Sequence, residues 1–585
     1  MAKHLFVSLL LSFIVVASSA YSVDMASTEI ETQPWQHALA MHGTPKYNTD
    51  FKHLEYANPD APKGGTLKEG VVGSFDTLND HIILGEMAKG LELTSDPLMQ
   101  RVWDEPFTLY GLVAQEIKIS PRRDWVLFKL NPKAVFHDGT PMTAVDVKYS
   151  FEMYRKHGHP VRRRVYSLVK NVEVRSDQEI LFKFGEGYDQ ETALILAIMP
   201  VLPKHYWTQH DISKTTLTPP LGSGPYKIKN VDAGRSITYE RVENYWAADL
   251  PINKGSYNFD TITYSYYRDT DIALEAFKAG ETDIRREYDI AAWQKAYKSP
   301  RLESGAFVKT KFVHARPEKV KAFVFNTRRE PFDQVNVRRA LSLAFHFDQI
   351  NEIFYSGAFN RIQSYFPNSE LSHHKTEGII PFVYPTSATP QAQRNNMRQA
   401  KKLLSDAGYV IKDKKLVNAE TGAPFTFEIL LQNASDEKIA LFYKSTLQRL
   451  GITANIRTVD TAQFTGRLDQ FDYDVILYQW YNSLSPGAEQ MNYWGKAAAI
   501  TNGSRNYAGV SDDKIDALAL SIGEAETRTG LVAQARALDN ALMHKHYSIP
   551  LWYLGADLIA HDRSLRSVDY APMYGTVNET WWREK

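Results

Sequence analysis

FTFEILL, residues 425–431, opens the stretch of sequence that decides the fold. ITANIRTV (452–459) and DVILYQW (474–480) follow it, and each is a short apolar run typical of a strand. Between the first two runs lies the helical segment 437–450, which Gly451 ends. Strand, helix and strand with short links predict a parallel sheet with a right-handed crossover. The third run is almost uninterrupted, which favours a strand covered on both faces.

Local signals place further elements on either side of this sheet. A turn at APKGG (61–65) predicts a strand over 66–72, and WVLFKL (125–130) contains a second strand. Thr143 is a good N-cap with Asp146 three residues on, so a helix should follow it. The apolar residues at i, i+3, i+4, i+7 and i+10 from Val337 to Phe347 predict one further helix that packs one face.

Length and composition bound the class of protein. A chain of 585 residues is too long for one core, so at least two domains are expected. Lys plus Arg and Asp plus Glu are both 68, and this zero net charge argues against nucleic acid as a partner. There is no Cys, which excludes disulfides, thiolate metal sites, Cys nucleophiles and a lipid on an N-terminal Cys.

The first 20 residues have the order of a secretory signal. Lys3 and His4 precede an apolar run over 5–16, and ASSA (17–20) then supplies small residues, so we expect cleavage after Ala20. The alternative is an uncleaved anchor, although the run is short for a membrane span. The sequence thus predicts export to a periplasm as a soluble protein that is not lipid-anchored.

A set of ordered motifs resembles a known family. They are KGGT (63–66), WVLFKL (125–130), FHDGTP (136–141), TAVDV (143–147), GSGPY (222–226), FNT (325–327), PF (331–332) and VRRAL (337–341). In this order they resemble the family 5 extracellular solute-binding proteins, the peptide-binding receptors of ABC importers. EYANP (55–59), GSFDTLN (73–79), DEPF (104–107) and LQRLGI (447–452) look most like the YejA-type subgroup. Members of that subgroup are associated with oligopeptides, peptide antibiotics and cell-wall peptides.

The resemblance implies an α/β fold, a two-lobed periplasmic binding protein-like clamp (type II, cluster C) with mixed sheets and a two-strand hinge. Matching positions put the first lobe at 30–310 plus 550–585, with an extra subdomain at about 75–215, and the second lobe at 311–549. The implied function is a monomeric receptor that carries a peptide or peptide-like ligand to the transmembrane subunits of an ABC permease.

The resemblance also implies where ligand contacts lie. Trp480, Tyr481, Asn482 and Ser483 follow the apolar strand, where peptide receptors of the family line the cleft; Trp480 is equally well explained as core, and Trp494 fits either place. Phe75, Asp76 and Asn79 should face the cleft from the first lobe. Further candidates are Arg361 and Tyr365 after a helix, with a surface Arg as the alternative, and Trp552 and Tyr553 near the hinge.

One departure concerns the ligand's amine. Many peptide-binding members have an Asp shortly after this Trp, whereas the chain has Asn482 and Ser483. A neutral group does not offset the cost of burying an ammonium. Either another carboxylate replaces it, with Asp76, Asp104, Glu105 and Glu489 as candidates, or the amine is blocked, exposed or absent.

Other classes of function have weaker signals. No Gly-x-Ser-x-Gly or His-Glu-x-x-His motif occurs, so no catalytic residue is assigned, and an exported hydrolase acting on peptides or wall fragments stays the alternative. Two histidine pairs, His373 with His374 and His544 with His546, lack a third ligand at a recognisable spacing. A binding protein for nickel or haem is therefore a further alternative, and no cofactor or metal is expected.

Overall fold

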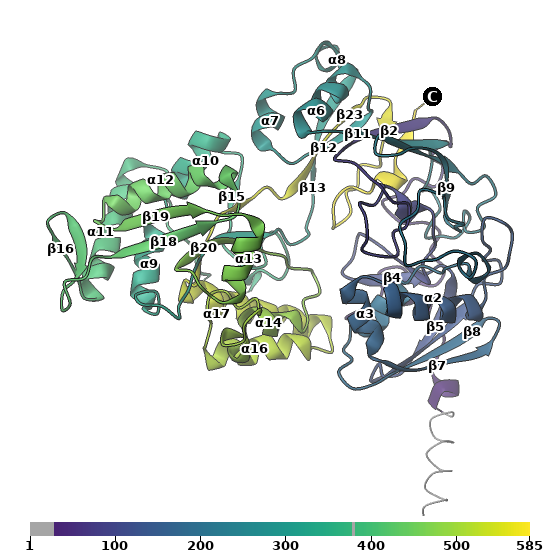
Figure 1. The fold of residues 1–585 in the computed structure, drawn as a ribbon, viewed down its shortest axis with the longest axis horizontal. Helices are drawn as coiled ribbons and strands as arrows, with labels where there is room; N and C mark the ends of the chain where they lie inside the picture. Colours follow the sequence, from purple (N-terminus) through teal and green to yellow (C-terminus); the bar gives the residue numbers. More distant parts are fainter. Residues whose placement is uncertain (1–28, 377–380, 585) are drawn as a thin grey trace, which may run out of the picture.

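The computed structural model describes residues 29–376 and 381–584, so the predicted signal segment 1–20 lies outside the described residues. Figure 1 shows two bodies joined by thin connections. We call them lobe I (29–313 with 556–584) and lobe II (320–553). Among the described residues, no helix is both long and apolar enough to cross a membrane.

Lobe I is built on a seven-stranded mixed sheet with the order β13-β23-β12-β2-β11-β10-β9. β2 runs parallel to β11 and β12, and the other neighbours are antiparallel. The predicted strand 66–72 is β2, and Gly65 before it has φ 76°, which side chains rarely permit. The elements are β2 (Thr66–Val72), β9 (Tyr226–Asp232), β10 (Ser236–Arg241), β11 (Thr261–Tyr267), β12 (Ile284–Glu287), β13 (Phe307–Val313), β23 (Ala556–Asp562), β24 (Leu565–Arg566), β25 (Trp582–Arg583), α6 (Thr270–Ala279), α7 (Ile290–Lys295), α8 (Pro300–Glu303) and η4 (Asn578–Thr580).

A second part of lobe I contains the four-stranded antiparallel sheet β5-β6-β8-β7. The helix predicted after Thr143 is α2, and the Thr143 N–H donates to Asp146 Oδ2 at 3.0 Å. Val147 and Phe151 of α2 are buried against the sheet. The elements are β1 (Ala38–Ala40), η1 (Leu91–Leu93), β3 (Met99–Arg101), β4 (Thr108–Gly111), β5 (Ala114–Ile119), β6 (Trp125–Leu130), α2 (Ala144–His157), α3 (Pro160–Ser167), β7 (Val169–Ser176), β8 (Glu179–Phe184), α4 (Thr192–Ala197) and α5 (Lys204–Trp207).

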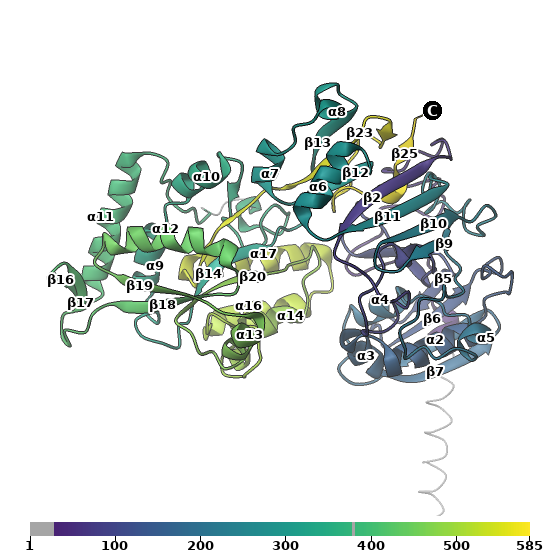
Figure 2. The same ribbon diagram turned by 45° about the horizontal axis from the view of Figure 1, so that its top comes forward.

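Lobe II is built on the sheet β19-β18-β20-β14-β21. β18 pairs in parallel with both β19 and β20, which confirms the predicted parallel strands. Figure 2 shows α12, the crossover helix, along one face. The elements are β14 (Val320–Phe325), α9 (Val335–Leu343), α10 (Phe347–Tyr355), β15 (Asn360–Arg361), η2 (His373–Lys375), α11 (Pro390–Asp406), β16 (Tyr409–Lys412), β17 (Lys415–Asn418), β18 (Thr426–Leu431), η3 (Ala434–Asp436), α12 (Glu437–Gln448), β19 (Thr453–Thr458), α13 (Thr461–Asp469), β20 (Val475–Trp480), α14 (Glu489–Trp494), α15 (Lys496–Ala499), α16 (Asp513–Gly523), α17 (Arg528–Lys545), β21 (Ser548–Pro550) and β22 (Trp552–Tyr553).

The prediction of one continuous helix from Val337 to Phe347 is wrong. The structure has two helices, because α9 ends at Leu343 and α10 begins at Phe347 after a non-helical His346. Phe345 and Phe347 are both buried. Residues two apart point to nearly opposite sides of a straight helix, so the break lets both rings reach the core.

Two short segments connect the lobes. One runs from β13 to β14, and the other runs from β22 to β23. They are held together because the His314 N–H donates to the Gly555 carbonyl at 3.3 Å and the Gly555 N–H donates to Glu318 Oε1 at 3.0 Å. Two adjacent crossings of this kind form a hinge, since few groups resist a change of φ and ψ there.

Candidate binding cleft

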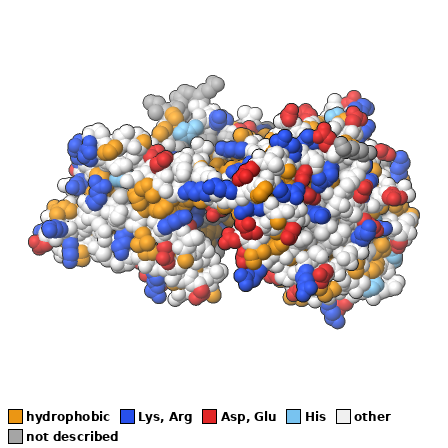
Figure 3. All heavy atoms as spheres, turned by 90° about the horizontal axis from the view of Figure 1, so that it is seen from above, with side chains coloured by type: hydrophobic (Ala, Val, Ile, Leu, Met, Phe, Trp, Pro, Cys, Tyr) orange, Lys and Arg blue, Asp and Glu red, His pale blue; other side chains and the backbone are white. Residues whose placement is uncertain are grey.

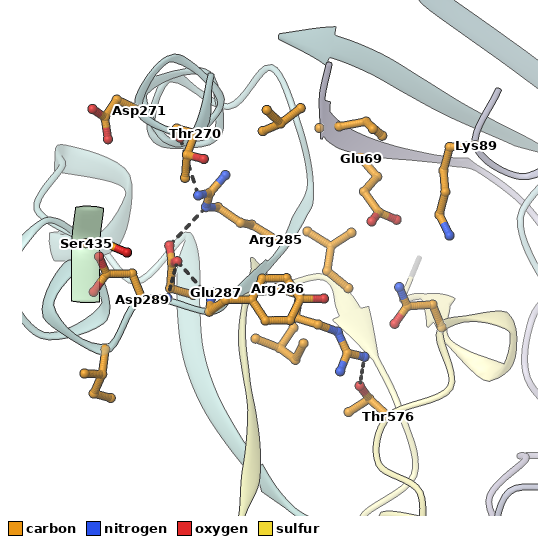
Figure 4. A pocket seen from close by; sticks show the side chains of 18 of the residues that line it. Glu69, Lys89, Thr270, Asp271, Arg285, Arg286, Glu287, Asp289, Ser435 and Thr576 are labelled. Atoms are coloured by element: carbon orange, nitrogen blue, oxygen red, sulfur yellow. Dashed lines mark hydrogen bonds and ion pairs between the residues drawn. The ribbon is translucent and has the colours of Figure 1, made fainter. Parts of the chain in front are cut away.

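A cavity of about 1100 Å³ lies between the two lobes. Lobe I contributes the end of β2, β12 and the segment before β25, and lobe II contributes the start of β14, η3, α12 and Trp552. Figure 3 shows charged side chains of both signs along the boundary between the lobes, and Figure 4 shows part of the cavity wall. Because both lobes line it, a molecule that fills the cavity contacts both.

The end of β2 presents an open strand edge to this cavity. β11 pairs with β2 along its whole length, but β12 pairs with it only at Glu69. Gly70, Val71 and Val72 line the cavity, and Val72 is 49% exposed. A strand edge without a neighbour offers backbone donors and acceptors to an extended ligand.

The basic side chains on β12 are already paired within the protein. Arg286 Nη1 lies 2.7 Å from Asp557 Oδ1, and Arg286 Nη2 donates to Thr576 Oγ1 at 2.6 Å. Arg285 Nε donates to Tyr297 Oη at 3.1 Å and lies 3.3 Å from Glu287 Oε2. These residues shape the wall, but their charge is largely compensated before a ligand arrives.

Glu69, by contrast, makes no ion pair or hydrogen bond with the residues drawn around it (Figure 4). Burial between the cavity walls raises the pKa of Glu69 to about 7, against the opposing charges of Lys89 and Arg286. Glu579 and Glu92 add to this rise. The cavity therefore has an acidic side on lobe I.

Glu69→Gln should stabilise the protein at high pH. The pKa of the Glu69 carboxyl is near 4.5 in the unfolded chain and about 7 in the folded protein. The free-energy cost of burying its charge is therefore absent below about pH 4.5 and complete above about pH 7. The gain should reach about 1 to 2 kcal/mol, less than the full shift implies because water enters the cleft. Urea unfolding at pH 4.5 and pH 8 measures it. The exposed control Glu86→Gln should show no such difference.

The aromatic residues predicted for the wall are mostly in the core of lobe II. Trp480 is 1% exposed, and its ring lies 6.0 Å from that of Tyr365 and 5.1 Å from that of Trp494. Tyr365 Oη shares a hydrogen bond of 2.8 Å with Ser548 Oγ, which fixes it further. The structure thus places these three residues in one buried cluster of lobe II, together with side chains of α16 and α17.

The segment after β20 differs residue by residue. Tyr481 is 59% exposed, and Lys319 Nζ lies 5.0 Å from its ring centroid. Asn482 is held inside lobe II, since its Nδ2 donates to the Tyr365 carbonyl at 2.6 Å. Ser483 Oγ accepts the Ser485 N–H at 3.1 Å. Tyr481 and Ser483 are both exposed, so of these three residues only Asn482 is tied to lobe II through its side chain.

The three residues predicted after β2 support the loop itself. Phe75 is buried with its ring 5.0 Å from that of Tyr266, and Asp76 Oδ1 accepts the Glu86 N–H at 2.7 Å. Asn79 is buried, and its Nδ2 donates to the carbonyls of residues 212 and 214, each at 2.9 Å. These contacts anchor the chain beyond β2 and leave Phe75 and Asn79 away from the cavity.

The candidates near the hinge divide between two cavities. Trp552 lines the 1100 Å³ cavity, and its ring centroid lies 5.1 Å from that of Tyr355, with the ring planes tilted by 54°. Arg361 and Tyr553 line a separate cavity of about 700 Å³ beside the hinge. Arg361 lies over the Tyr384 ring at 4.2 Å, and burial lowers its pKa to about 10.

The carboxylates considered as substitutes for the missing Asp are engaged elsewhere. Asp104 Oδ2 accepts from Lys46 Nζ at 2.8 Å, and Glu105 Oε1 accepts from Tyr110 Oη at 2.6 Å. Glu489 Oε2 accepts the Gly487 N–H at 2.9 Å. The acidic residues that line the cavity, including Glu69, Glu92 and Glu579, were missed, because they lie on three separate segments without a shared motif.

The lobes also touch away from the hinge. Gly43 of lobe I lies against Arg528 of lobe II. A methyl group on Gly43 would be only 3.4 Å from the Cβ of Arg528. Figure 1 shows α14 of lobe II facing lobe I well below the connections. Burial raises the pKa of Glu191 on lobe I to about 7, and the charge of Glu489 on lobe II raises it further. The two lobes are therefore close to each other here as well as at the hinge.

Comparison with known proteins places the chain in a family. The family described as "Bacterial extracellular solute-binding proteins, family 5 Middle" matches residues 108–502. A probable peptide-binding protein YejA of Agrobacterium fabrum is 36% identical, and the match covers 98% of each chain. A peptidoglycan-binding protein YepA of the same organism is also 36% identical over 93% of this chain and 94% of its own.

Solved structures share the fold. The oligopeptide-binding protein AppA of Bacillus subtilis, in complex with a nonapeptide, superposes with a TM-score of 0.63 at 22% identity, covering 90% of this chain and 100% of AppA. The two-lobed α/β architecture predicted from the sequence is thus confirmed. The chain belongs to the family 5 bacterial extracellular solute-binding proteins.

Proposed function

We propose that this protein is an exported receptor that captures peptides or peptide-containing compounds and delivers them to the permease of an ABC importer. The observation that carries the proposal is the 1100 Å³ cavity lined by two lobes that only a two-segment hinge connects. A ligand that contacts both lobes favours the closed arrangement, because its affinity for that state is the higher. The permease then recognises the closed receptor.

The chemistry of the cavity wall suits a peptide. The open edge of β2 can pair with an extended backbone, and such pairing is independent of ligand side chains. Tyr355, Phe359 and Trp552 supply apolar surface, while charged groups of both signs lie around them. The cavity of about 1100 Å³ is slightly larger than small-molecule sites, which span about 300 to 1,000 Å³.

The relatives support this class of ligand. One relative is named as a probable peptide-binding protein and another as a peptidoglycan-binding protein, and AppA was solved with a nonapeptide. Cell-wall peptides and oligopeptides are therefore the ligands to test first. A receptor returns its ligand unchanged, whereas the alternative, an exported hydrolase, does not.

We further propose that residues 1–20 are removed on export and that the mature protein works as a monomer in the periplasm. The charged, apolar and small-residue order of the first 20 residues supports export. The limits 30–310 with 550–585 for one lobe and 311–549 for the other are proposed as the units that move, except that β22, which pairs with β15, moves with the second.

The test mixes the purified protein with a defined peptide digest and identifies the retained peptides by mass spectrometry after release. We expect retained peptides of unchanged mass. Trp552→Ala should weaken retention by about 1 to 3 kcal/mol, or about 5- to 150-fold, because the indole forms part of the cavity wall.

Tyr570→Ala is the matched control, since Tyr570 is an exposed aromatic residue outside the cavity, and it should leave retention unchanged. Shortened peptides would favour the hydrolase instead. No retained peptide at all would contradict a peptide receptor.

A further inference from the structure

A side pocket of about 430 Å³ in lobe I adjoins the main cavity. The two share Glu92 and Glu579 as lining residues, so a ligand in the main cavity has access to the mouth of the side pocket. The side pocket is lined mainly by apolar and aromatic groups of lobe I, and Arg101 is its one basic residue. A basic group in such surroundings requires an explanation.

Arg101 is held by three aromatic rings. Its guanidinium carbon lies 5.0 Å from the ring centroid of Trp103, 4.9 Å from that of Phe107 and 4.6 Å from that of Tyr574. The Tyr574 N–H donates to the Trp103 carbonyl at 2.9 Å, which fixes two of these rings relative to each other. Stacking of this kind stabilises the cation through its faces and leaves its in-plane N–H donors unused.

At least one of those donors has no acceptor among the described residues. Arg101 Nε is buried without a hydrogen-bond acceptor, and Tyr574 Oη beside it is also buried without a partner. No described carboxylate lies within ion-pair distance of Arg101, whereas Arg285 and Arg286, also in lobe I, both have one. A partly buried guanidinium without a carboxylate partner can bind an anion, so a ligand that supplies one fits this place.

The acidic groups nearby do not fill this place. Asp96 lies in the wall of the side pocket, but its oxygens accept from Tyr245 Oη at 2.7 Å and Trp246 Nε1 at 2.8 Å. Glu191 feels the charge of Arg101 without forming an ion pair with it. Glu92 and Glu579 stand at the mouth, where they would repel a free anion but accept an ammonium carried by the same ligand.

We propose that Arg101 binds a carboxylate of the ligand in this side pocket. The receptor is then selective for peptides that carry a carboxylate, either on an Asp or Glu side chain or at a free C-terminus. This inference rests on the proposed peptide-binding function. Guanidinium and carboxylate match in a planar, two-point geometry, and a preformed guanidinium loses little freedom on binding.

The test uses an equimolar library of synthetic peptides in four forms: acidic side chains or their Asn and Gln amides, each with a free or an amidated C-terminus. Wild type should retain the preferred acid form at least about tenfold over its amide, as one charge-assisted hydrogen bond predicts. The side-chain and C-terminal arms show which carboxylate is read. Arg101→Met should abolish the preference, and Arg101→Lys should keep part of it.

Arg122→Met is the matched control, because the Arg122 side chain is 78% exposed, and it should retain the wild-type preference. Circular dichroism and the melting temperature show that each variant is folded. Equal retention of acid and amide forms by wild type, or an unchanged preference in folded Arg101→Met, would overturn this inference alone. Retention of no peptide by wild type would overturn both it and the proposed function.

Discussion

Trp480→Ala is expected to lower the free energy of unfolding by about 3 to 5 kcal/mol, as is typical for the loss of a buried Trp. The indole packs against Tyr365 and Trp494 in the core of lobe II, and the rigid strand β20 cannot close the cavity that remains. Most of the cost is lost packing, because Trp480 Nε1 has no hydrogen-bond partner among the described residues. Urea unfolding followed by fluorescence measures it.

Tyr481→Ala is the matched control for this change. The neighbouring ring is mostly exposed, so its loss should alter stability by no more than about 0.5 kcal/mol. A loss of less than about 1 kcal/mol for Trp480→Ala, accompanied by weaker peptide retention, would instead make Trp480 a wall residue.

Asp557→Asn is expected to cost about 2 to 4 kcal/mol, because it removes the one anion between two guanidinium groups. Asp557 Oδ1 lies 2.7 Å from Arg316 Nη2 and 2.7 Å from Arg286 Nη1, and its Oδ2 accepts the Thr576 N–H at 3.0 Å. These partners lie on a hinge segment, on β12 and on the C-terminal segment. The variant should therefore loosen both the hinge and the cleft wall.

The pH dependence gives this prediction a second readout. Burial alone would raise the pKa of Asp557, but the hydrogen bond from Arg316 and the charge of Arg286 lower it to about 2. The stabilisation is therefore complete above about pH 4 and is lost as pH falls toward 2. The difference in stability between wild type and variant should be constant from pH 5 to 8 and should shrink below pH 4.

The exposed pair between Arg566 and Glu584 supplies a control. Glu584→Gln should change stability by less than about 0.5 kcal/mol, since surface ion pairs contribute little. If Asp557→Asn lowers the free energy of unfolding by an equally small amount, the carboxylate does not stabilise the two guanidinium groups. The wall formed by Arg286 would then not depend on this contact.

Local pattern was sufficient for the strands and for most helices. The runs at 425–431 and 474–480 became the parallel strands β18 and β20, and Thr143 with Asp146 begins α2 as expected. These features depend on residues a few positions apart, whose geometry the local backbone fixes. The break between α9 and α10 was missed, because it follows from how Phe345 and Phe347 reach the core.

The cleft was less accessible to prediction. The ordered motifs indicated the family, and Trp552 lies at the cavity as expected. The sequence could not tell which of Trp480 and Tyr481 is buried. That depends on where helices from later in the chain pack against the end of β20, and they cover Trp480. The role of the remaining predicted ligand contacts stays a prediction.

The sequence by itself determined the strands and helices, the parallel crossover, the family and the absence of any cysteine chemistry, because these depend on neighbouring residues or on composition. Only the tertiary structure decided which charges are compensated. Glu69, Arg101 and Glu579 are distant in the chain, and their partners or lack of partners follow from contacts between segments hundreds of residues apart. Electrostatic energy depends on distance and solvation in space, which position along the chain does not specify.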